Sequence, residues 1–114
     1  MIDPDSRIPV RFGALSDAAP DAALLLEGGM EGPSGPPTAR FEVPANFGHP
    51  IGCACCLPRG PVAEALSRLY LARARGEAPL FGQVLAVTAS SAGRRAVADA
   101  LAADMLTKGR FRLA

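Results

Sequence analysis

The chain has 114 residues, of which 49% are hydrophobic and 20% charged, and its formal net charge is +1. This length and composition are typical of a single domain, 1–114, with one hydrophobic core. Because positive and negative charges are interleaved and nearly balanced, we expect neither nucleic acid nor a membrane as a partner. No stretch approaches the roughly 20 apolar residues that span a bilayer, and the N-terminus lacks the plan of a signal peptide, so we expect a cytoplasmic protein.

The first part of the chain predicts a strand followed by a helix. Apolar and polar residues alternate from Ile8 to Leu15, with Pro9 near the start, which is typical of a short strand. Asp17 can then cap a short helix that continues to Leu26. We interpret residues 8–27 as a degenerate first strand and helix.

A segment rich in glycine and proline separates this part from the rest. Residues 28–38 contain too little apolar surface to form an element, so we expect a flexible linker. The next strand is predicted at Arg40–Val43, and residues 40–114 are the region that carries the most informative motif.

The second half predicts two amphipathic helices around a buried strand. We expect a helix at about 61–75, a strand at 84–87 and a helix at about 93–107, with a short strand at 111–113. Ser90 or Ser91 is the expected cap of the last helix, whose apolar face holds Val97, Leu101 and Met105. This order predicts an α/β fold with a small, mainly parallel sheet and flanking helices.

All three cysteines of the chain stand within four positions, at Cys53, Cys55 and Cys56. Three thiolates close together provide three of the four ligands that zinc usually takes, and they suit other thiophilic transition metals as well. Their odd number and small count do not fit a secreted disulfide scaffold. The fourth ligand would be His49, a water or a group from a partner, although His49 can equally be a solvent-exposed imidazole.

Two other interpretations of the cysteines stay open. Cys53 and Cys56 have the spacing of a redox Cys-x-x-Cys pair, but Pro58-Arg59-Gly60 separates them from the following helix, whereas redox motifs open a helix directly. The thiols can also be relics on a scaffold that serves protein contacts. A helix that begins near Pro61 would favour thiolate at Cys56 through its positive end.

The Gly-Cys-Ala-Cys-Cys run at 52–56, preceded by Phe41-Glu42-Val43 and followed by the predicted helix and buried strand, resembles the middle of the G domain of the CobW family of metal-handling GTPases. The resemblance covers roughly residues 40–114. It implies a P-loop-type G domain in which Cys53, Cys55 and Cys56 bind a divalent metal.

The departures from that family are equally specific. The family's phosphate loop needs a lysine after the first strand, whereas this chain has Ser16-Asp17-Ala18-Ala19-Pro20-Asp21 there and Lys108 as its only lysine. We therefore expect a truncated pseudo-GTPase that binds no nucleotide and is not an enzyme. It would bind zinc for storage, sensing or delivery, like a metallochaperone. The alternative is a protein-interaction module, in which a homodimer or another protein covers an open sheet edge.

Overall fold

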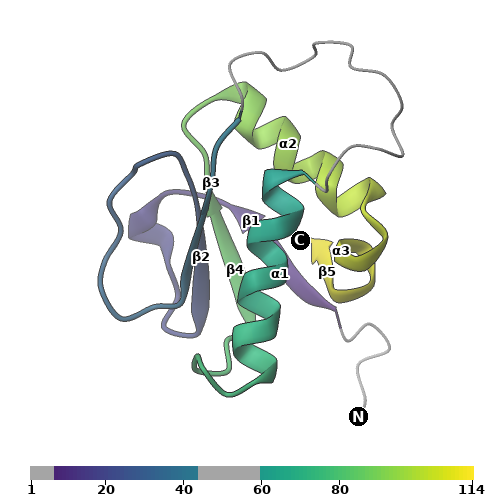
Figure 1. Cartoon of the computed structure of the whole chain (residues 1–114). Helices are drawn as coiled ribbons and strands as arrows, with labels where there is room; N and C mark the ends of the chain where they lie inside the picture. The colour runs from purple at the N-terminus through teal and green to yellow at the C-terminus, as the bar shows by residue number, and fades with distance from the viewer. Residues whose placement is uncertain (1–6, 44–59) are drawn as a thin grey trace.

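The computed structural model describes residues 7–43 and 60–114, and the fold is given for these residues only. They form a five-stranded, all-parallel sheet in the order β3-β2-β4-β1-β5, with three α-helices against it (Figure 1). The predicted α/β class with a parallel sheet and flanking helices is confirmed. The elements are β1 (Ile8–Phe12), η1 (Leu15–Asp17), β2 (Ala22–Glu27), β3 (Thr38–Phe41), α1 (Pro61–Ala74), β4 (Gln83–Val87), α2 (Ser91–Ala103), α3 (Met105–Arg110) and β5 (Phe111–Leu113).

The predicted helix from Asp17 to Leu26 is wrong. This part of the chain forms the short 3₁₀ turn η1 and then strand β2, which pairs with both β3 and β4. Residues 22–26 are all apolar and all buried, a pattern that a strand covered on both faces satisfies and a helix with one apolar stripe does not. Gly28 turns the chain after β2 with a φ of 72°, a conformation that favours glycine.

The sheet is covered differently on its two faces. The three helices lie on one face, where Val10, Leu25 and Ala86 pack against Leu66 and Val97 (Figure 1). The opposite face carries Leu24, Leu26, Leu85 and Val87, which are covered by Leu15, Ala18 and Met30 from the two connections that flank β2. The two faces therefore have separate cores.

The connection 28–37, predicted as a flexible linker, packs over this second face. A Cβ on Gly32 would lie 3.0 Å from the Cδ1 of Leu26, so the backbone passes close to the strand beneath it. Met30 packs in the same small core. Glycine thus allows close approach here, and the segment substitutes for the helix that would ordinarily cover this face.

The four crossovers share one hand. The chain moves from β1 to β2 and on to β3 over the second face, then returns from β3 to β4 and from β4 to β5 over the helical face. Because both the direction and the face reverse, the handedness is kept, as parallel crossovers require. Consequently the connections that leave the carboxyl ends of the neighbouring strands β2 and β3 diverge to opposite faces.

The single helix predicted at about 93–107 is two helices. Asp104, with φ −76° and ψ 119°, ends α2, and its Oδ2 accepts hydrogen bonds from the Thr107 amide at 3.0 Å and hydroxyl at 2.8 Å. Met105, predicted in the core, is 80% exposed, whereas Thr107 is buried. The apolar positions Val97 and Leu101 are buried as predicted.

The remaining elements differ from their predicted bounds by a few residues. The first strand ends at Phe12, and β3 begins and ends two residues earlier than predicted. Helix α1, strand β4 and the tail strand β5 are confirmed. Ser90, one of the two residues predicted as the cap, is the N-cap of α2. Within the described residues, no helix is long and apolar enough to cross a membrane.

Candidate functional site at the carboxyl edge of the sheet

The predicted metal ligands Cys53, Cys55, Cys56 and His49 lie outside the described residues. The structure does place the two ends of the chain segment that contains them. Val43 follows the carboxyl end of β3, and Gly60 precedes Pro61, the first residue of α1. The segment thus belongs to the crossover between β3 and β4.

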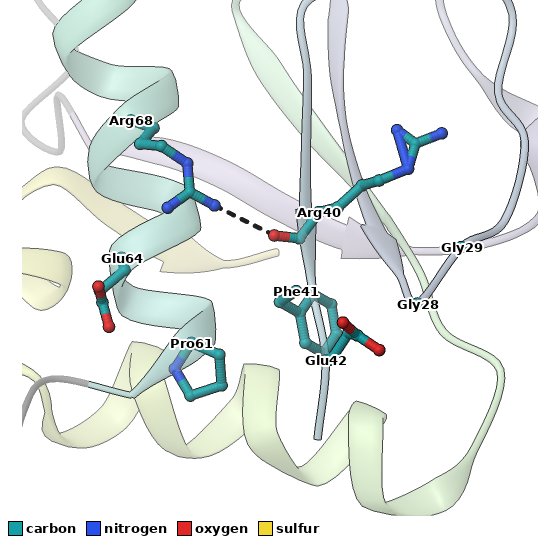
Figure 2. A pocket seen from close by; sticks show the side chains of 8 residues that line it. All are labelled: Gly28, Gly29, Arg40, Phe41, Glu42, Pro61, Glu64 and Arg68. Carbon is teal, nitrogen blue, oxygen red and sulfur yellow. Dashed lines mark hydrogen bonds between the residues drawn. The ribbon is translucent and has the colours of Figure 1, made fainter. Parts of the chain in front are cut away.

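A pocket of about 550 Å³ lies between these two ends and is called here the carboxyl-edge pocket. It is formed by the turn after β2, by the end of β3 and by the first two turns of α1 (Figure 2). In open parallel sheets, ligands bind at the carboxyl ends of strands where neighbouring crossovers diverge to opposite faces. The β2–β3 boundary meets that condition. The pocket is lined by Gly28, Gly29, Arg40, Phe41, Glu42, Pro61, Glu64 and Arg68.

Backbone contacts fix the base of the pocket. The Gly28 N–H donates to the Phe41 carbonyl oxygen at 2.7 Å, which joins the turn after β2 to the end of β3. The Phe41 side chain is buried among the residues of the helical face. The ends of β2 and β3 are therefore held together at the base of the pocket.

Four charged side chains surround the opening. The Arg68 guanidinium donates to the Arg40 carbonyl oxygen at 3.2 Å, and the Arg40 guanidinium donates to the Met30 carbonyl oxygen at 2.7 Å. Figure 2 shows the two arginine side chains on opposite sides of β3. Glu42 and Glu64 contribute carboxylates, and both residues are exposed. The pocket therefore presents both signs of charge to solvent.

Helix α1 directs its positive end toward this edge. Its N-cap is Gly60, which offers no side chain to accept from the first-turn amides, and Pro61 stands at the first helical position. Glu64 is the acidic residue of the first turn. The helix dipole favours a negatively charged group near this end.

The neighbouring crevice, between β2 and β4, is occupied by a side chain of the protein itself. Oε1 of Glu27 accepts from the Ala89 amide at 2.7 Å and the Ser90 amide at 3.1 Å, and Oε2 accepts from the Ser90 hydroxyl at 2.7 Å. Desolvation raises the pKa of Glu27, but the hydrogen bonds from Ser90 and Ala89 outweigh it and hold the pKa below 4.5. The carboxylate thus sits where an anionic ligand would meet the N-terminus of α2.

Glu27 was not anticipated from the sequence. A single carboxylate between an apolar strand and a glycine would have indicated a residue at a strand end. Residues 17–26 were interpreted as a helix, so this indication was missed. Glu42, directly after β3, is exposed and lines the carboxyl-edge pocket.

The two carboxylates of the segment 16–21, Asp17 and Asp21, are separated in the structure. Asp17 Oδ2 accepts from the Ala14 amide at 3.0 Å, within η1. Asp21 Oδ1 accepts from Gln83 Nε2 at 2.9 Å, at the opposite end of the sheet where β2 and β4 begin. Each therefore has a local structural role.

Within residues 7–43 and 60–114, no group of three or more His, Cys, Asp and Glu side chains has an arrangement suited to a metal ion. The metal prediction thus rests on the cysteine segment and its placement in the crossover. Comparison of the chain with protein-family models, with curated proteins and with solved structures finds no match.

Proposed function

We propose that the protein binds a thiophilic transition metal, with zinc as the first candidate, through Cys53, Cys55 and Cys56. One observation carries the proposal: the three thiols fall within four positions of the sequence between β3 and α1, and the residues near the two ends of that segment, Glu42 and Pro61, line the carboxyl-edge pocket. The role would be metal storage, sensing or delivery in the cytoplasm, without nucleotide hydrolysis.

The chemistry of the donor set supports a metal with one exchangeable position. Three thiolates leave a tetrahedral ion with one further ligand, which is His49, a water or a group from a receiving protein. A site completed by water or by a partner suits transfer better than permanent structure, because structural zinc sites are closed by four protein ligands. His49 is the only histidine of the chain, so its substitution separates these possibilities.

The setting of the segment supports thiolate rather than thiol. Cysteine must be deprotonated to bind a metal, and the N-terminus of a helix favours that form. Helix α1 begins at Pro61, five residues after Cys56, and its N-cap Gly60 has no side chain to satisfy the first-turn amides. The positive end of the helix dipole favours a negatively charged group in the preceding segment.

The similarity to the CobW family remains a prediction. In its favour are the Gly-Cys-Ala-Cys-Cys run and a helix and buried strand that follow it in the family's order. Nucleotide binding is not part of the proposal, because the single lysine Lys108 lies in α3, far along the chain from β1. The family's phosphate loop requires its lysine directly after the first strand.

The experiment is elemental analysis of protein purified under reducing conditions. The native chain should retain zinc at one ion per chain, and a Cys53→Ala, Cys55→Ala, Cys56→Ala variant should retain none. Circular dichroism checks that the triple variant keeps its secondary structure. His49→Ala serves as a second arm: retention of zinc would assign the fourth position to water or a partner, and loss would assign it to His49.

A redox protein would behave differently in the same assay. It would form a reversible Cys53–Cys56 disulfide with a measurable reduction potential and would carry no stoichiometric metal. Equal zinc content in the native chain and the triple variant would refute the proposed function.

A further inference from the structure

Within residues 7–43 and 60–114, strand β3 forms one edge of the sheet and pairs with β2 alone. The Pro37 and Phe41 carbonyl oxygens accept from the Leu24 and Gly28 amides, so the odd-numbered residues of β3 direct their backbone groups toward β2. The even-numbered residues of β3, Thr38 and Arg40, therefore direct theirs outward, and Glu42 follows the same alternation directly after the strand. The Arg40 carbonyl confirms this parity, because it accepts from Arg68 on the outer side.

The side chains along this edge alternate regularly. Thr38, Arg40 and Glu42 are exposed, whereas Ala39 and Phe41 are buried. The alternation continues through Glu42, so the chain keeps the period of a strand one residue beyond the end of β3. The free edge thus presents a cation and an anion two residues apart.

This charge pattern is self-complementary for one antiparallel register. If two β3 strands pair about a two-fold axis at Phe41, Arg40 of one copy lies opposite Glu42 of the other, and the reverse holds as well. Both residues have outward backbone groups, so each Arg40–Glu42 pair is a hydrogen-bonded pair. A shift that centres the axis on Arg40 would place two arginines opposite each other, which is unfavourable.

The same axis brings a second complementary pair together. A two-fold axis perpendicular to the sheet keeps both α1 helices on one face, antiparallel and next to each other across the junction. Glu64 and Arg68 line the carboxyl-edge pocket beside β3, one turn apart on α1. In the antiparallel arrangement, Glu64 of one copy faces Arg68 of the other.

Arg68 does not block this pairing. Its guanidinium reaches the Arg40 carbonyl from an exposed position at 3.2 Å, and a carbonyl oxygen has two lone pairs, so it can also accept from a second donor. The pocket beside the strand leaves about 550 Å³ open at this edge.

We infer that the protein forms a homodimer in which two β3 strands pair antiparallel about Phe41 and join two five-stranded sheets into one. Pairing covers an edge beside which the described residues place no other strand. The inference does not depend on the proposed metal site.

Charge reversal tests both the interface and its register. Sedimentation over a concentration series should show the native chain as a dimer. Arg40→Glu and Glu42→Arg should each weaken the dimer about tenfold or more, because like charges then face each other twice. The double reversal, Arg40→Glu with Glu42→Arg, should restore native dimerisation, since it rebuilds both pairs with opposite polarity.

Two further variants complete the test. Arg95→Glu changes the net charge as Arg40→Glu does, but at an exposed position of α2, and should leave the dimer unchanged. The variant without cysteines should dimerise like the native chain. A native chain that stays monomeric, a double reversal that fails to restore the dimer, or a dimer that is lost with the cysteines would each overturn the inference.

Discussion

The Glu27 carboxylate and the Ser90 hydroxyl form a hydrogen bond of 2.7 Å that joins the end of β2 to the start of α2. Ser90 Oγ in turn accepts from the Gly93 amide at 3.0 Å, so the contact extends into the first turn of the helix. Together with the Ala89 and Ser90 amides, these contacts satisfy donors that a helix N-terminus would otherwise leave open. Glu27 thereby determines how the β4–α2 connection sits on the sheet.

Replacement of Glu27 by Gln should destabilise the fold. The amide keeps the shape of the side chain but loses one acceptor oxygen and the negative charge at the helix N-terminus. We expect the free energy of unfolding to fall by about 1–2 kcal/mol, as for hydrogen bonds to a partly exposed charged group. Urea denaturation measures it, with the exposed Glu31→Gln as the matched control. Equal losses in both variants would contradict the assigned role of Glu27.

The Glu27 carboxylate should make the free energy of unfolding depend on pH in the acidic range. Against the effect of desolvation, hydrogen bonds from Ser90 and Ala89 hold its pKa in the folded state below the ordinary value of 4.5, so the folded state favours the charged form. The contribution is therefore complete above about pH 4.5 and is lost as the pH falls through the lower pKa of the folded state. The stability difference between native and Glu27→Gln protein should shrink below pH 4.5. A difference that stays constant from neutral pH into this range would contradict the linkage.

Gly93→Ala should destabilise the protein although alanine favours helices. A Cβ at this position would overlap the Glu27 carboxylate, so the hydrogen-bonded arrangement would have to shift. We expect a loss of about 1–3 kcal/mol. Gly109→Ala in α3 is the control, because a Cβ there meets nothing within 4 Å, and it should stabilise by about 0.5–1 kcal/mol.

A double variant identifies the cause of the Gly93 effect. With Ala in place of Glu27, the obstruction is gone, and Gly93→Ala should become neutral or stabilising. The double-mutant cycle measures this coupling directly. Additive losses would show that the two residues do not interact.

Asp104→Ala should destabilise the region where α2 ends and α3 begins. The carboxylate caps α3 through the Thr107 amide and hydroxyl, so its removal should cost about 1 kcal/mol. Asp104→Asn keeps an acceptor oxygen and should recover most of that loss. Thermal unfolding compares the three proteins, and identical midpoints would contradict the capping role.

The sequence predicted the second half of the fold better than the first, for a physical reason. Helix α1 has a clear helical period, and strand β4 is a short apolar run with polar residues, Gln83 and Thr88, at its two ends, so both were predicted closely. The run Ala22–Leu26 has no period at all, because β2 is buried on both faces, and such a run is compatible with either helix or strand. Pro20 and Gly28 can mark the ends of either a helix or a strand. Pairing with neighbouring strands therefore decides which of the two forms.

The site was predictable only in part. The cluster of cysteines is visible in the sequence and lies outside the described residues, whereas the carboxyl-edge pocket depends on the strand order β3-β2-β4-β1-β5, which no local pattern encodes. Arg68 and Gly28 meet at one pocket because a helix and a turn about 40 residues apart converge at the end of β3. At Asp104 the sequence pattern was misleading for another reason. The apolar period predicted one helix through this position, but Asp104 caps α3 and so divides the predicted helix in two.

Cobalt(II) titration of the reduced protein tests the proposed metal function most directly, because thiolate-to-cobalt charge-transfer absorption reports sulfur ligation itself. The account predicts saturation at one ion per chain, absorption of the strength expected for three thiolates, displacement by zinc, and no such absorption from the variant in which Cys53, Cys55 and Cys56 are alanine. Cobalt binding by the native chain that is no tighter than by this variant, with no charge-transfer band, would contradict it.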